Sequence, residues 1–106
     1  MKKIEAIIRK SKFDDVVKAL HDVDVHFFSY WDVTGVGNEK IGNVYRGITY
    51  STKDIPRRCL SIIVSDSFVD ATVDAIIKSG ATGEVGDGKV FVLPCEEAYR
   101  IRTGEK

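Results

Sequence analysis

A glycine-rich segment at residues 82–89 carries the clearest chemistry in this sequence. It reads Thr-Gly-Glu-Val-Gly-Asp-Gly-Lys, and Gly83 through Lys89 fits the G-x-x-x-x-G-K part of a phosphate-binding loop. Glycines let backbone N–H groups converge on an anion, and the Lys89 ammonium supplies a point charge for a phosphate. Val90 stands where a P-loop needs Ser or Thr, and a strand follows where it needs a helix. The pattern therefore excludes an ordinary P-loop ATPase, and a plain glycine-rich turn is the alternative.

Two arginines near the end of the sequence could support the same chemistry. Arg100 and Arg102 alternate with Ile101, so on an extended segment both guanidinium groups would point the same way. Two guanidinium groups on one side suit a di- or triphosphate. Gly35 and Gly37 follow an apolar segment but lack the rest of a dinucleotide-binding fingerprint.

The remaining polar residues do not form an enzyme site. Tyr45 and Tyr50 lie in a polar stretch and are candidates for partner contacts or modification. His21 and His26 have no third residue at metal-ligand spacing. No nucleophile can be matched with a base and an orienting group, which disfavours an enzyme.

These residues must be positioned by an alternating pattern of strands and helices. Two capping-box patterns predict helix starts, and Gly80 is expected at the C-cap of the second helix. A stretch from Gly35 to Ile55 has no sustained apolar period, which predicts a long functional loop, with a long, partly paired hairpin as the alternative. The expected strands span 3–8, 25–34, 58–64 and 89–93, and the capping boxes are Ser11/Asp14 and Ser67/Asp70.

The β-α-β, long loop, β-α-β order predicts an α+β fold. Two βαβ halves form a ferredoxin-like sandwich, an antiparallel four-stranded sheet with both helices on one face. The other face would stay uncovered, with Ile7, Phe28, Tyr30 and Phe91 as candidates to lie there. An exposed apolar face of this kind predicts a symmetric oligomer.

Composition narrows the class of protein. The chain has 106 residues, so one domain is expected. Hydrophobic residues make up 43% and charged residues 30%, which is typical of a globular protein. Sixteen basic and sixteen acidic residues leave a net charge of zero, which argues against a nucleic-acid binder or a polybasic membrane binder. With two cysteines, no membrane-span pattern and no signal-peptide pattern, a cytoplasmic location is expected.

Four segments together resemble the PII nitrogen-regulatory signalling proteins. They are the opening MKKIEAIIR, the Tyr45-Arg46-Gly47-x-x-Tyr50 pattern, the TG-x-x-GDGK-VFV segment from Thr82, and the RIRTGE ending from Arg100. The likeness covers essentially the whole chain. It implies a ferredoxin-like homotrimer, one domain over residues 1–106, with ATP and ADP competing for clefts between subunits. It also implies a long T-loop, about residues 36–55, that docks onto partners such as an ammonium transporter or a nitrogen-metabolism enzyme.

The resemblance also implies roles for individual residues. The loop at 82–89 would hold phosphates through Gly86, Asp87, Gly88 and Lys89, joined from the tail at 95–106 by Arg100 and Arg102. Gly35 and Gly37 would shape the cleft, with Ser29 and Thr82 nearby. Arg57 stands where the family has a lysine that meets the carboxylate of 2-oxoglutarate. Tyr50 matches the residue that many relatives nucleotidylate.

One departure from the family bears on its effectors. Asn38-Glu39 stands where the family usually has Arg-Gln, and that glutamine helps to position the Mg²⁺ that bridges ATP and 2-oxoglutarate. A Glu39 carboxylate suits Mg²⁺ but repels the dianion. We therefore expect binding of Mg-ATP with little or no response to 2-oxoglutarate.

Three alternative functions compete with this one. The first is a divergent regulator of another transporter or enzyme. The second is an acylphosphatase-like hydrolase, but residues 9–15 (RKSKFDD) contain no glycine-containing phosphate loop. The third is an RNA-binding module, but residues 88–93 (GKVFVL) carry one aromatic residue where a pair is needed.

Overall fold

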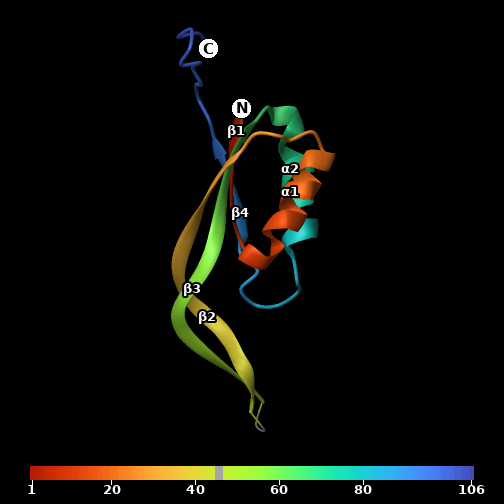
Figure 1. Cartoon of the computed structure of the whole chain (residues 1–106), viewed down its shortest axis with the longest axis vertical. Coiled ribbons are helices and arrows are strands. Elements are labelled where there is room, and N and C mark those ends of the chain that lie inside the picture. The colour runs from red at the N-terminus through yellow and green to blue at the C-terminus, as the bar shows by residue number, and fades with distance from the viewer. Residues whose placement is uncertain (45–46) are drawn as a thin grey trace.

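The computed structural model has one antiparallel sheet with two α-helices on one of its faces (Figure 1). It describes the backbone of residues 1–44 and 47–106 and the side chains of residues 1–36 and 54–106. The strands are β1 (Lys2–Ile8), β2 (Ser29–Val44), β3 (Gly47–Val64) and β4 (Lys89–Pro94), and the helices are α1 (Phe13–Asp22) and α2 (Val69–Gly80). The sheet order β2-β3-β1-β4 confirms the ferredoxin-like prediction.

The core lies between the sheet and the two helices. Alternate residues of the inner strand β1 face the helices, so Ile4 and Ala6 are fully buried there. They pair across the sheet with Ile62 and Leu60, which are buried on the same face. Together with Val16, Leu20 and Ile76 from the helices they form one apolar cluster. Burial of this face, at about 25 cal/mol per Å² of apolar surface, is the main term that holds the sheet on the helices.

The opposite face of the sheet carries large apolar side chains that other elements of the chain do not cover. Trp31, Ile63, Phe91 and Leu93 are between 40% and 47% exposed and belong to strand positions that alternate with the core positions. We call these four residues the open-face cluster. The prediction that Phe91 and Ile7 lie on this face is confirmed by the register, in which Ile7 pairs with Cys59 and Lys89.

The prediction for Phe28 and Tyr30 was wrong. Phe28 packs against the core cluster, and the Tyr30 ring lies 4.6 Å from the Phe13 ring at the start of α1, so both are on the helix side. The reason is that aromatic residues alternate on both faces of 25–34, and hydrophobicity alone cannot choose the buried one.

The connection from α1 to β2 also differs from the prediction. β2 begins at Ser29, and residues 25–28 are not part of a strand. Asp24 has a left-handed φ of 64°, the Val25 N–H donates to the Leu20 carbonyl, and the Asp24 N–H donates to the His21 carbonyl. This is a Schellman ending with an aspartate where glycine is usual. It keeps Val25 in the core cluster although it lies outside the sheet.

Both helices begin without the predicted capping boxes. Short 3-10 turns at Lys10–Lys12 and Asp66–Phe68 precede α1 and α2, and the N-cap side chains, Lys12 and Phe68, make no capping hydrogen bond. Backbone bonds from Lys12 to the Arg9 carbonyl and from Phe68 to the Ser65 carbonyl take their place. Gly80 is the last residue of α2 and is buried, whereas the C-cap is the extended Ala81.

Most of the segment between the second and third predicted strands, expected as a loop, is β-strand. β2 runs to Val44 and β3 begins at Gly47, so the alternative of a long hairpin describes this backbone better than an irregular loop. Backbone pairing needs no apolar period when main-chain groups satisfy one another. The predictions for Gly37, Glu39, Tyr45 and Tyr50 concern residues whose side chains lie outside the described part of the chain.

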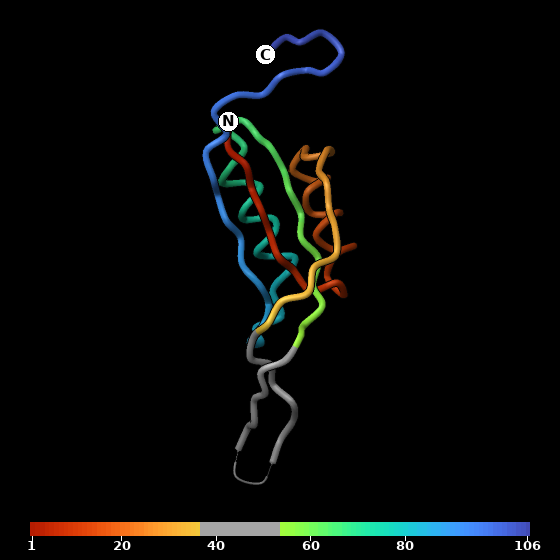
Figure 2. The backbone as a smooth tube through the Cα atoms, turned by 90° about the vertical axis from the view of Figure 1, so that its left-hand side faces the viewer, coloured from red at the N-terminus to blue at the C-terminus, as the bar shows by residue number. Residues whose placement is uncertain are grey.

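Residues 95–106 leave the sheet at the end of β4. Figure 2 shows them at the end of the molecule opposite the turn that joins α2 to β4. No helix in the described part of the chain has the length and apolar character that a membrane crossing requires.

Candidate phosphate-binding site

The turn from α2 into β4 contains the predicted phosphate loop, residues 82–89, and its glycines adopt conformations that favour glycine. Gly83, Gly86 and Gly88 have φ values of 87°, 97° and 106°. At Gly88 a Cβ atom would lie 1.8 Å from the Ile7 carbonyl oxygen, so the loop backbone passes directly against the end of β1. This backbone conformation fits both the predicted phosphate loop and its alternative, a plain glycine-rich turn.

The Asp87 carboxylate holds the loop together. It accepts hydrogen bonds from the backbone N–H groups of Thr82 and Gly83, each at 2.9 Å, and from the Thr82 hydroxyl. The Arg9 Nε donates to the same carboxylate at 2.9 Å. The Asp87 side chain is therefore occupied by the loop itself, and its negative charge does not suit a phosphate. Asp87 can contribute to phosphate binding through its backbone.

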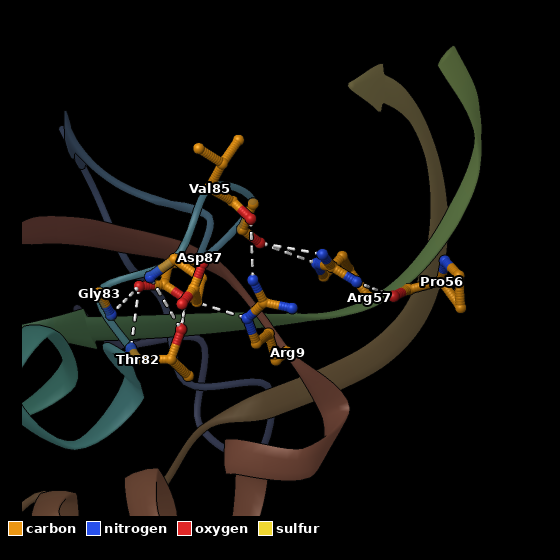
Figure 3. A network of polar contacts seen from close by, with 9 residues as sticks. Arg9, Pro56, Arg57, Thr82, Gly83, Val85 and Asp87 are labelled. Carbon is orange, nitrogen blue, oxygen red and sulfur yellow. Dashed lines mark hydrogen bonds and ion pairs between the residues drawn. The ribbon is translucent and has the colours of Figure 1, made fainter. Parts of the chain in front are cut away.

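Two arginines, one just after β1 and one on β3, hold the carbonyl side of the loop (Figure 3). The Arg9 Nη2 donates to the Val85 carbonyl oxygen at 2.9 Å. The Arg57 Nε and Nη2 donate to the Gly86 carbonyl oxygen at 3.2 and 2.9 Å, and its Nη1 donates to the Pro56 carbonyl at 2.8 Å. Arg9 follows β1 and Arg57 belongs to β3, so the loop is tied to two strands that are adjacent in the sheet.

The hydrogen bonds to Asp87 make the stability of the fold depend on pH, with stability lost in acid. Donation from the Thr82 hydroxyl, the Arg9 guanidinium and the loop amides holds the pKa of the Asp87 carboxyl well below its usual range. Since the folded-state pKa is depressed, the carboxylate stabilises the fold fully above the ordinary aspartate pKa of about 3.9. This stabilisation is lost as the pH falls from there through the folded-state value.

We therefore expect wild-type protein to be more stable than Asp87→Asn at neutral pH. The difference in free energy of unfolding should stay constant above about pH 5 and shrink progressively below about pH 4. Urea unfolding of both proteins over this range measures it. A difference that keeps its full size into strong acid would contradict the assignment.

An open cavity of about 560 Å³ borders the loop, within the size range of small-molecule sites. It gathers residues from β1, β2, the loop and β4, which are far apart in the sequence. The lining residues are Ile7, Val36, Glu84, Gly86, Asp87, Gly88, Lys89 and Phe91. The exposed Lys89 lines the cavity together with apolar side chains, so the cavity can take a ligand with an anionic part and an apolar part.

The structure brings together some of the predicted site residues and separates others. Thr82 and the run from Gly86 to Lys89 share the loop, and Gly35 precedes Val36 of the cavity. Ser29 lies on β2, the sheet edge opposite β4. Arg57 binds the loop, as described above.

Arg100 and Arg102 lie far from the loop of their own chain. Lys89 is the first of the six residues of β4, and the rest of this strand, about 17 Å long, separates it from the start of the tail. The expectation that the two arginines point the same way on an extended segment was wrong. Residues 101–103 form a turn, in which the Gly104 N–H donates to the Arg100 carbonyl and the Arg100 N–H to the Glu105 carbonyl, each at 2.7 Å.

Sequence reasoning missed the part that Arg9 plays. One feature of the sequence could have pointed to Arg9 as a residue of the site. Arg9 continues the alternation of β1 on the same side as Ile7, which lines the cavity. A charged residue just past a strand is common, however, and nothing in the sequence shows that the loop 76 residues later turns its carbonyls toward it.

Comparison with known proteins agrees with this architecture. The family model for Nitrogen regulatory protein P-II matches residues 1–105. Nitrogen regulatory protein P-II of Azospirillum brasilense is 43% identical over 107 aligned positions, which cover all of this chain and 96% of the relative. Nitrogen regulatory protein P-II 1 of Escherichia coli K12 has the same identity and coverage. The chain therefore belongs to the nitrogen regulatory protein P-II family.

Proposed function

We propose that this protein is a non-enzymatic signalling protein that binds ATP and ADP at the loop 82–89 and thereby controls partners in nitrogen metabolism. The observation that carries the proposal is the loop itself, in which left-handed glycines and Lys89 border an open cavity. Family membership supports the nitrogen-regulatory role.

The chemistry of nucleotide binding follows from the loop. Backbone N–H groups around Gly86 and Gly88 are donors for phosphate oxygens, and the Lys89 ammonium adds charge. Ile7, Val36 and Phe91 offer apolar surface in the same cavity. The described side chains supply no set of Mg²⁺ ligands at the loop, so a metal ion held with ATP would draw on the phosphates and on Glu39.

A homotrimer is the proposed assembly. The open-face cluster leaves apolar surface that a second copy can cover. Arg100 and Arg102 belong to residues 95–106, a segment that lies at the end of the molecule opposite the loop (Figure 2), and a neighbouring copy could supply them to it. A site shared between copies would then contain both the loop and the paired guanidinium groups.

Residues 36–55 are the proposed segment that contacts partner proteins. Between β2 and β3 this segment would dock onto a membrane ammonium transporter or a nitrogen-metabolism enzyme from the cytoplasm, and Tyr50 is the candidate site of nucleotidylation. A bulky anionic adduct there would oppose docking both sterically and electrostatically.

Replacing Lys89 with alanine tests the nucleotide site. A charge-assisted contact to phosphate contributes about 1.5–3 kcal/mol, so Lys89→Ala should weaken ATP binding by about one to two decades. Calorimetric titration of ATP measures the affinity, and native mass spectrometry should give the same trimer for both proteins.

Lys78→Ala is the matched control. Lys78 lies on α2 and pairs with Asp74 at 2.9 Å, outside the residues that line the cavity. It should leave ATP affinity unchanged. Equal ATP affinities of Lys89→Ala and the wild-type protein would contradict the assignment of the loop to the nucleotide site.

A further inference from the structure

Two consecutive carbonyl oxygens of the phosphate loop are each held by an arginine, one just after β1 and one on β3. Arg9 binds the Val85 carbonyl and Arg57 binds the Gly86 carbonyl with two of its nitrogens. Each nitrogen of the Arg57 guanidinium donates to a main-chain oxygen, either that of Gly86 or that of Pro56. We call Arg9, Arg57 and the two carbonyls the arginine clamp (Figure 3).

The clamp fixes more than the carbonyls. A peptide unit is planar and trans, so its N–H points opposite to its C=O. Holding the Val85 carbonyl therefore sets the direction of the Gly86 N–H, and holding the Gly86 carbonyl sets that of the Asp87 N–H. Both N–H groups face away from the guanidinium groups. Gly86 joins these two peptide units with a positive φ of 97°, and residues of positive φ also occur in anion-binding nests.

Asp87 fixes the other end of the same loop. Its carboxylate accepts from the Thr82 and Gly83 amides and from Arg9, so Arg9 bridges the carboxylate and the Val85 carbonyl. The Arg9 side chain is 21% exposed, and that of Asp87 is 24% exposed, so this contact is partly shielded from water. The loop is thus constrained on its carbonyl side by side chains of its own chain.

We propose that the arginine clamp holds the loop in its anion-binding arrangement before any ligand arrives, with Arg57 as a positioning residue that does not itself contact the phosphate. Preorganisation of this kind raises affinity because the ordering cost is met during folding. The identity of the anion as an adenine-nucleotide phosphate rests on the proposed function. The clamp itself is a property of the ligand-free chain.

The matched variants are Arg57→Lys, Arg57→Gln and Arg58→Lys. Lysine keeps the charge of Arg57 but cannot bond the Gly86 and Pro56 carbonyls at once in the same geometry. Arg58 is the neighbouring residue and pairs with Asp32 at 2.9 Å, away from the loop. Arg58→Lys therefore makes the same chemical change on the same strand without touching the clamp.

The first measurement needs no nucleotide. Backbone ¹⁵N order parameters of Gly86 and Asp87 in the ligand-free protein should fall from about 0.85 toward 0.6 in both Arg57 variants and stay unchanged in Arg58→Lys. Arg9→Lys should lower them as well, and thermal melting verifies that each variant is folded. Order parameters unchanged by both Arg57 substitutions would overturn the clamp.

The second measurement separates positioning from charge. ATP affinity by calorimetry should fall about tenfold in Arg57→Lys, although the charge is kept. If Arg57→Lys binds ATP as tightly as the wild-type protein while Arg57→Gln binds it more weakly, Arg57 acts through its charge alone. That result would overturn the positioning role. If the wild-type protein binds no ATP, the nucleotide proposal fails, while the order parameters still decide the clamp.

Discussion

Replacing Gly88 with alanine should abolish nucleotide binding and lower the free energy of unfolding by about 3 kcal/mol. A Cβ at this position would lie 1.8 Å from the Ile7 oxygen and 2.8 Å from the Ile7 carbonyl carbon. Both atoms are backbone of β1, an inner strand of the sheet, and cannot swing aside as a flexible side chain could. The φ of 106° adds strain for any residue with a Cβ. Relief of the clash must therefore move the loop and the first residues of β4.

Gly83→Ala is the control that separates the two effects. Gly83 also has a positive φ, 87°, but a Cβ there would meet nothing within 4 Å. Its cost should be the backbone strain alone, about 1 kcal/mol. Urea unfolding and ATP calorimetry on both variants make the comparison. A Gly88 variant no worse than the Gly83 variant would show that the close approach to Ile7 is not a constraint.

The second large effect concerns 2-oxoglutarate. By resemblance to the family, Glu39 takes the place of a glutamine that helps to position the Mg²⁺ between ATP and this dianion. A like charge about 4 Å away costs on the order of 4 kcal/mol near a protein surface, before the metal and Arg57 offset part of it. We expect the protein to bind Mg-ATP yet respond weakly or not at all to 2-oxoglutarate, which leaves the ATP/ADP ratio as its main input.

Titration of 2-oxoglutarate into protein saturated with Mg-ATP tests this expectation. Glu39→Gln should tighten 2-oxoglutarate binding by at least about tenfold, because it removes the charge and keeps the size of the side chain. Glu84→Gln is a suitable control, because it removes a carboxylate of the same cavity that the family pattern does not connect with the dianion. Micromolar binding of 2-oxoglutarate by the wild-type protein, with no tighter binding in Glu39→Gln, would contradict the prediction.

The sequence predicted the parts of the fold that repeat. The short, β-branched and apolar run at 3–8 predicted a strand. Apolar residues at the helical period, among them Leu20 and Ile76, predicted helices, because burial against one core imposes that period. The glycine spacing at 83, 86 and 88 predicted a tight turn in the site. These signals are local, and each needs only the residues near it in the chain.

Features set by a single atom or by distant partners escaped prediction. Asp24 adopts a left-handed conformation that is usually expected of glycine, so the start of β2 was placed at residue 25 and not at Ser29. Arg9 and Arg57 reach carbonyls of a loop that is distant in sequence, and a carbonyl leaves no trace in the sequence. The face of Tyr30 depended on register, where a shift of one residue exchanges inside and outside.

The separation of Arg102 from Lys89 within one chain also has a genetic consequence. In the proposed trimer each site would take its loop from one copy and its tail from the next. A chain defective at Lys89 and a chain defective at Arg102 would then each fail alone but complement one another when expressed together. Every mixed trimer would contain a position where the intact loop of one chain meets the intact tail of the other. Two mutant alleles would thus complement one another when one mutation lies in the loop before β4 and the other in the tail after it.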